Sequence, residues 1–192
     1  MGFNIENIIL IIIIGLCIFV FLYIKEKYNK QIREVSKYLN ATTKKKFIFN
    51  QIIEDQFNNI PYVIKYLLNR YSSAFQIEFH VKPPFKLSIR KENIDTRISK
   101  KIGLVKEIKI NVPDFDNKYL ILSDDKMLSE QYLYNPRIRE IIEYIDSKGW
   151  NMRFKKTHVY LEKEIKHNEQ LVISGAEVKE ILENVYEISQ KW

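Results

Sequence analysis

An unbroken apolar run from Ile8 to Ile24 is the strongest constraint on how this chain can fold. Helical residues rise about 1.5 Å each, so a run of this length spans roughly 25 Å, near the lower limit for crossing the hydrocarbon core of a bilayer. Ile5 and Tyr23 extend the match into the two interfaces. The run therefore predicts a single transmembrane anchor within residues 1–24.

A cleavable signal peptide is the alternative interpretation, because such peptides also begin a chain with an apolar run. Here residues 2–7 carry no Lys or Arg, and no small-x-small cleavage site follows Ile24. The run is also longer than the usual core of a signal peptide. We therefore expect the helix to stay attached as a signal-anchor.

The basic residues lie on one side of the run only, which predicts the orientation of the chain. All of them come after Ile24, and short basic flanks are retained in the cytoplasm. The N-terminus is expected outside the cell membrane, and everything from Lys25 onward in the cytoplasm. The single cysteine, Cys17, lies inside the apolar run, so the soluble part has no disulfide of its own, as suits a reducing compartment.

The net charge of +7 is concentrated beside the membrane segment. Residues 1–24 contribute −1, residues 25–46 contribute +6, and residues 47–192 contribute only +2. Basic side chains held near an anionic leaflet gain about 1 kcal/mol each, so anionic lipids account for the charge and nucleic acid is not an expected partner. A simpler interpretation is that these residues only set the topology. The candidates for contact with lipid headgroups follow the helix directly: Lys25, Lys27, Lys30 and Arg33.

The segment after the membrane continues the helix as a stalk, because residues 25–40 contain no Pro or Gly. Apolar side chains repeat along it at spacings of four, three and four: Tyr28, Ile32, Val35 and Leu39. Two heptads are fewer than a convincing coiled coil needs, so the stripe fits either a homodimer through the stalk or a stalk that leans on its own domain. Polar residues 41–46 are expected to be the linker that completes this basic juxtamembrane region.

Residues 47–192 are expected to form one soluble α+β domain, in which a largely antiparallel sheet packs with two or three helices. Residues 60–71 show a helical stripe behind Pro61, although their β-branched content leaves a strand open. Alternating patterns predict strands at 75–81, 85–90, 105–112 and 119–123 and a hairpin within 150–163. Capping residues and stripes predict helices at 126–133, 135–149 and 174–188.

Motifs that would identify an enzyme or a cofactor are missing from the sequence. The three glycines beyond the membrane segment are too far apart for a phosphate-binding or dinucleotide-binding loop. The histidines His80, His158 and His167 show no metal-ligand spacing, and no thiol lies outside the membrane segment. We therefore expect no cofactor and no catalytic residue of a known motif.

An acidic cluster is the one candidate for chemistry, and it comprises Asp114, Asp116, Asp124 and Asp125. Clustered carboxylates can hold Ca²⁺ or Mg²⁺, and paired ones can perform acid–base catalysis when their pKa values differ. The favoured interpretation is structural, because Pro113-Asp114 is typical of a turn and Ser123, Asp124 or Asp125 of a helix N-cap. A strand of about five residues would also separate the two pairs by roughly 17 Å.

The same region carries a resemblance to a known group of proteins. The residues concerned are Gly103-Leu104, Glu107-Ile108, Pro113-Asp114-Phe115-Asp116, Tyr119, Ile121, Ser123-Asp124-Asp125, Leu133 and Ile138-Arg139. In these residues the chain resembles uncharacterised membrane-anchored prokaryotic proteins that join one or two N-terminal transmembrane helices to a soluble α+β domain. The resemblance covers about residues 75–192 and implies the architecture only.

Two classes of function fit these observations. The first is a single-pass membrane protein whose cytoplasmic domain is an interaction or ligand-binding module, which the anchor, the short stripe and the lack of catalytic motifs favour. The second is a membrane-proximal enzyme that uses the acidic cluster.

Overall fold

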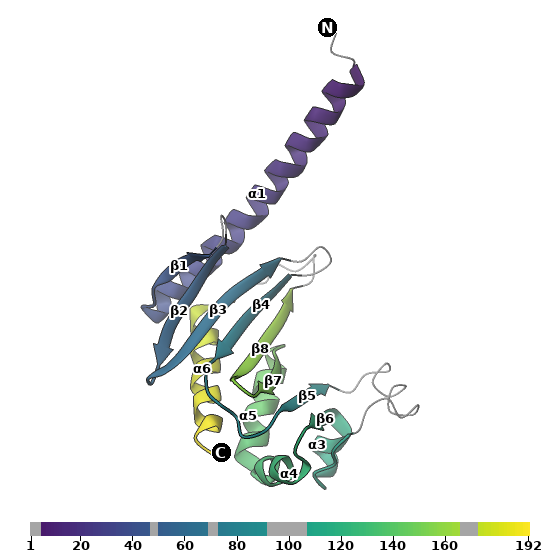
Figure 1. The fold of residues 1–192 in the computed structure, drawn as a ribbon, viewed down its shortest axis with the longest axis vertical. Coiled ribbons are helices and arrows are strands. Elements are labelled where there is room, and N and C mark those ends of the chain that lie inside the picture. Colours follow the sequence, from purple (N-terminus) through teal and green to yellow (C-terminus); the bar gives the residue numbers. More distant parts are fainter. Residues whose placement is uncertain (1–4, 47–49, 69–72, 92–106, 166–172) are drawn as a thin grey trace.

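The computed structural model describes residues 5–46, 50–68, 73–91, 107–165 and 173–192. A long N-terminal helix leads into an 8-stranded antiparallel sheet with helices packed beside it (Figure 1). The chain is therefore of the mixed α+β class that its sequence predicts. Its first helix is long and apolar enough to span a membrane.

The helices are α1 (Ile5–Leu39), α3 (Pro113–Lys118), α4 (Lys126–Tyr134), α5 (Pro136–Ser147) and α6 (Gly175–Ser189). The strands are β1 (Thr43–Lys46), β2 (Asn50–Phe57), β3 (Ile60–Leu68), β4 (Ser73–Phe79), β5 (Leu87–Lys91), β6 (Tyr119–Ser123), β7 (Asn151–Lys155) and β8 (His158–Ile165). The strands lie in the order β1-β2-β3-β4-β8-β7-β5-β6, and each neighbouring pair is antiparallel.

One face of the sheet carries a continuous row of apolar side chains. Directly opposed residues of antiparallel strands point to the same face, so the register defines rows that cross the sheet. The apolar row runs from β2 to β6 and comprises Ile53, Ile64, Ile77, Leu161, Met152, Ile89 and Ile121. None of these side chains is more than 5% exposed. This apolar row forms the side of the hydrophobic core that the sheet contributes.

Helices α5 and α6 pack in this core through stripes of aliphatic residues. The buried residues of α5 are Ile138, Ile141, Ile142 and Ile145, and those of α6 are Val178, Ile181, Leu182, Val185 and Ile188. Spacings of three and four place each set on one side of its helix. Both helices begin where the sequence predicts, because the side chains of Asn135 and Ser174 accept hydrogen bonds from the first-turn N–H groups of Arg137 and Glu177.

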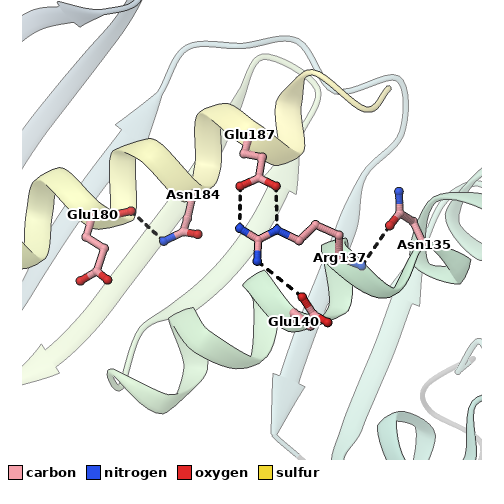
Figure 2. A network of polar contacts seen from close by, with 6 residues as sticks. All are labelled: Asn135, Arg137, Glu140, Glu180, Asn184 and Glu187. Atoms are coloured by element: carbon pink, nitrogen blue, oxygen red, sulfur yellow. Dashed lines mark hydrogen bonds and ion pairs between the residues drawn. The ribbon is translucent and has the colours of Figure 1, made fainter.

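Figure 2 shows how α5 and α6 are joined at their surface. The guanidinium of Arg137 donates two parallel hydrogen bonds to the carboxylate of Glu187, at 2.7 and 2.8 Å. A further contact of 3.5 Å links Arg137 to Glu140. The hydrogen bonds from Arg137 lower the pKa of Glu187. Because the pair is exposed, we assign it a role in the relative placement of the two helices rather than a large stabilisation.

The C-terminal half of α1 is part of the domain core. The side chains of Ile32 and Val35 are 1% and 0% exposed, and α1 contacts β2, β3 and α6. The ring of Tyr28 stacks on that of Tyr66 in β3, with 3.8 Å between the ring centroids. The apolar run and the core of the domain therefore share one uninterrupted helix.

The apolar stripe of the stalk is thus occupied by the chain itself. Tyr28 and Leu39 also pack against the core, so the whole stripe leans on its own domain. A coiled coil along the same stripe would require α1 to leave the domain. The contact with α6 is close, because a Cβ atom at Gly175 would overlap the side chain of Tyr38. A glycine at this position allows the two helices to approach.

Two segments differ from the sequence prediction. The helical stripe at 60–71 is wrong for Ile60–Leu68, which forms β3, because antiparallel pairing with β2 and β4 satisfies its backbone on both sides. Residues 43–46 of the expected linker form β1. Asn40 ends α1 in a left-handed conformation with φ of 53°, which turns the chain so that β1 can pair with β2.

The strand predicted at 105–112 is also wrong for its described part. Residues 107–112 are irregular, although the N–H of Ile108 donates to the carbonyl of Ile121 at 2.9 Å. Residues 105 and 106 lie outside the described part. Pro113-Asp114 opens the short helix α3 rather than an isolated turn.

Replacing Ile32 with Ala should destabilise the full-length protein by about 2–5 kcal/mol, because it leaves a cavity between α1 and the sheet. The measurement is thermal unfolding in detergent micelles, followed by the fluorescence of the buried Trp150. Glu34→Ala, at an exposed position on the same helix, is the control and should change stability by less than about 0.5 kcal/mol. Equal effects of the two substitutions would contradict the docking of α1.

Candidate functional site

The face of the sheet opposite the core is polar, and we call it the open face. Its central row comprises Glu54, Val63, Glu78, Tyr160, Arg153, Ser88 and Leu122. Apart from Tyr160, which is 8% exposed, these side chains are half-buried. No described helix packs on this face, because the long helices gather on the other one (Figure 1). Apolar and polar side chains that alternate along each strand are typical of an antiparallel sheet with only one face in the core.

Glu78 is the charged centre of the open face. Its carboxylate accepts a hydrogen bond of 2.5 Å from the ammonium of Lys65 on β3. Burial alone would raise the pKa of Glu78, but the hydrogen bond and charge of Lys65, together with His158 and His80, lower it below the ordinary value. Glu78 is therefore ionised at neutral pH, and its charge is balanced mainly by Lys65.

A polar cluster lies beside this pair. The hydroxyl of Tyr160 donates to Glu162, and the amide of Gln76 donates to the Tyr160 hydroxyl. Burial and Glu162 raise the pKa of Tyr160, so the phenol stays protonated and serves as a donor. Gln76 is only 5% exposed although it lies on the open face. These bonds fix the middle of the face in one arrangement.

A shallow groove of about 570 Å³ lies on the open face over the β2–β3 hairpin. Pro61 and Val63 supply apolar surface to it, and Lys44 and His80 supply polar side chains. The ammonium of Lys44 pairs with Glu54 at 2.9 Å. Apolar surface with a few polar groups is what a polar small molecule or a peptide segment requires.

The fold brings together two histidines that the sequence keeps apart. The ring centroids of His80 and His158 lie 5.8 Å from each other. The Nδ1 atom of His158 lies 2.9 Å from the hydroxyl of Thr157, whereas its Nε2 atom is buried and has no hydrogen-bond partner among the described residues. Alternation placed both histidines on polar faces of strands, but the pairing of β4 with β8 could not be read from the sequence.

The acidic candidates do not converge. Asp116 is 7% exposed, and its two carboxylate oxygens accept the backbone N–H groups of Ile110 and Val112 at 3.1 and 3.2 Å. Asp114 is exposed in the first turn of α3. Asp116 therefore stabilises a turn before β6 through these two hydrogen bonds.

The other pair lies at the far end of β6. Asp124 accepts the N–H of Lys86 at 2.7 Å, and Asp125 is the N-cap of α4, where it accepts the N–H of Leu128 at 3.0 Å. Within the described ranges, no three His, Cys, Asp or Glu residues are grouped as a metal site would require. These positions fit the structural interpretation of the cluster.

The four basic candidates of the stalk differ in their surroundings. Lys25 is 9% exposed with its ammonium 5.6 Å from the ring centroid of Phe21, and Arg33 pairs with Glu26. Lys27 and Lys30 are exposed. Only these last two present a fully accessible ammonium next to the apolar run.

Comparison with protein families, with curated proteins and with solved structures gave no match.

Lys65→Met should reduce stability at neutral pH by less than about 1 kcal/mol, because the ion pair is partly exposed to solvent. The lowered pKa of Glu78 means that its stabilising contribution is complete above the ordinary value of 4.5 and is lost as pH falls below it. The difference between the wild type and the variant should therefore shrink toward pH 3 in thermal unfolding. Lys179→Met, on the exposed side of α6, should show no such convergence.

Proposed function

We propose that this chain is a single-pass membrane protein that presents the open face of its sheet as a binding surface in the cytoplasm. The apolar half of α1 would span the cell membrane with the N-terminus outside. The domain would bind a partner or ligand on the face that its own described helices leave uncovered.

The observation that carries this proposal is the double role of α1. The same helix contains the apolar run and, eight residues after Ile24, the core residue Ile32. That separation is about 12 Å along a helix, so the domain would stand directly beside the bilayer. Because Val35 is also fully buried, the domain cannot swing freely on a linker. A binding surface would then keep a fixed orientation to the membrane.

The helix also supports a retained anchor over a cleaved signal peptide. The residues after Ile24 are helical and enter the core within about two turns. No small-x-small site follows the run. Cleavage after Ile24 would cut inside this helix, close to the residues that pack in the domain core.

Anionic lipids are a proposed second contact of the anchor. Lys27 and Lys30 lie about 4.5 and 9 Å beyond Ile24 along the helix, which is within about one Debye length of the headgroups. Both side chains are exposed. Lys25 and Arg33 would add to the local positive charge from less accessible positions. An enzyme that uses the acidic cluster is not favoured, because its carboxylates hold backbone N–H groups in separate places.

The orientation can be tested with a single cysteine at the exposed position 37. In a Cys17→Ser background, we expect Lys37→Cys to react with a membrane-impermeant maleimide only after the cells are lysed. Asn4→Cys in the same background is the matched control and should react in intact cells. The reverse pattern would overturn the cytoplasmic placement of the domain.

The binding surface can be tested by site-specific photo-crosslinking in membranes. Gln56 is exposed on the open face. When a photoreactive amino acid replaces it in the full-length, membrane-embedded protein, we expect one discrete crosslinked adduct with the bound partner. The same group at Lys179, exposed on α6, is the control and should give none. Adducts at Lys179 but not at Gln56 would place the binding surface elsewhere and contradict the proposal.

A further inference from the structure

We propose that His80, His158 and Lys155 form a binding site for a phosphoryl group on a soluble ligand, at one end of the open face. The inference rests on the proposed function, because it names the chemistry that this face would recognise.

Three neighbouring strands bring these side chains together. Lys155 on β7 is directly opposed to His158 on β8, so both point to the open face. His80 follows β4, whose last residue, Phe79, is opposed to Val159, and its ring lies 5.8 Å from that of His158. The ammonium of Lys155 rests over the ring of Tyr160, 4.2 Å from the centroid. The three donors therefore form one continuous patch.

In the described part of the chain, Glu78 acts on both histidines, and Glu54 and Asp55 line the same groove as His80. Lys155 makes no ion pair there, and the nearest acid to the histidines, Glu78, is already bonded to Lys65. The buried Nε2 atom of His158 has no hydrogen-bond partner among the described residues. A bound oxyanion would accept hydrogen bonds from the exposed side chains of Lys155 and His80, and the positive charge of protonated His158 beside them would attract it.

The chemistry of the patch selects a tetrahedral oxyanion. Protonated imidazoles and an ammonium are pure donors, and a phosphoryl group offers three terminal oxygens to accept from them. The patch lies near the start of β8, at the end of the sheet far from the apolar half of α1 (Figure 1). A soluble ligand reaches this end more readily than a lipid headgroup does.

Binding should depend on pH through the imidazole of His158. Burial lowers the pKa of His158, and Lys155, His80 and Lys65 lower it further, whereas Glu78 raises it. His158 is therefore mostly neutral above its ordinary value of 6.5, and an added dianion must draw a proton onto it. Because a charged hydrogen bond is stronger than a neutral one, affinity should rise as pH falls.

The test is calorimetric titration of sulfate, which keeps its charge across this range, into the full-length protein in phosphatidylcholine nanodiscs at constant ionic strength. We expect affinity to be about tenfold higher at pH 5.5 than at pH 7.5. His158→Gln should weaken binding about tenfold at pH 5.5 and flatten the pH dependence, and His80→Gln should also weaken binding about tenfold at pH 5.5. Lys155→Gln, at an exposed position that leaves the fold intact, should weaken binding at both pH values, and because Lys155 lowers the pKa of His158, the rise in affinity should begin at a higher pH.

The control is Lys179→Gln, which removes the same charge from α6 and should bind sulfate like the wild type. Equal sulfate affinity in the wild type and the three patch variants would overturn the phosphoryl site. If photo-crosslinking at Gln56 still succeeded, the proposed function would stand without it. Nanodiscs that contain phosphatidylserine should not change the affinity, and competition by this lipid would overturn the assignment to a soluble ligand.

Discussion

Burial of one face of the sheet is the constraint on which the rest of the structure depends. The apolar row from Ile53 to Ile121 crosses seven strands without a polar residue, and a surface of this kind must be removed from water. Helices α5, α6 and the second half of α1 supply the aliphatic stripes that cover it. Because all of them pack on this side, no described helix packs on the opposite face, whose central row keeps charged and polar side chains.

Helix α1 joins this core to an apolar segment that is long enough to span a membrane. Its first half is apolar all round and exposed, as a membrane span must be, whereas its second half buries one side only. The change occurs at Lys25, where the basic residues begin. The helix needs no flexible linker, because its C-terminal turns are themselves part of the domain. The apolar half of α1 and the sheet are therefore joined without a flexible segment between them.

Local signals in the sequence predicted the helices well and the candidate site poorly. Asn135 and Ser174 mark α5 and α6 because an N-cap is a contact between neighbours in the chain. Residues 60–68 carry apolar side chains at spacings that fit a helix, and only pairing with β2 and β4 makes them a strand. The acidic cluster was conspicuous because its members are close in sequence, yet Asp116 and Asp124 hold different turns.

The sequence by itself determined the apolar anchor, the basic stalk beside it and the α+β class, since each depends on composition or on spacing within a few residues. Only the tertiary structure decided that the stalk packs into the core, that residues 43–46 join the sheet, and that His80 lies against His158. The reason is the period of a strand. Alternation tells which residues share a face, but the partner and the register come from contacts between distant segments, and a shift by one residue would move every side chain to the other face.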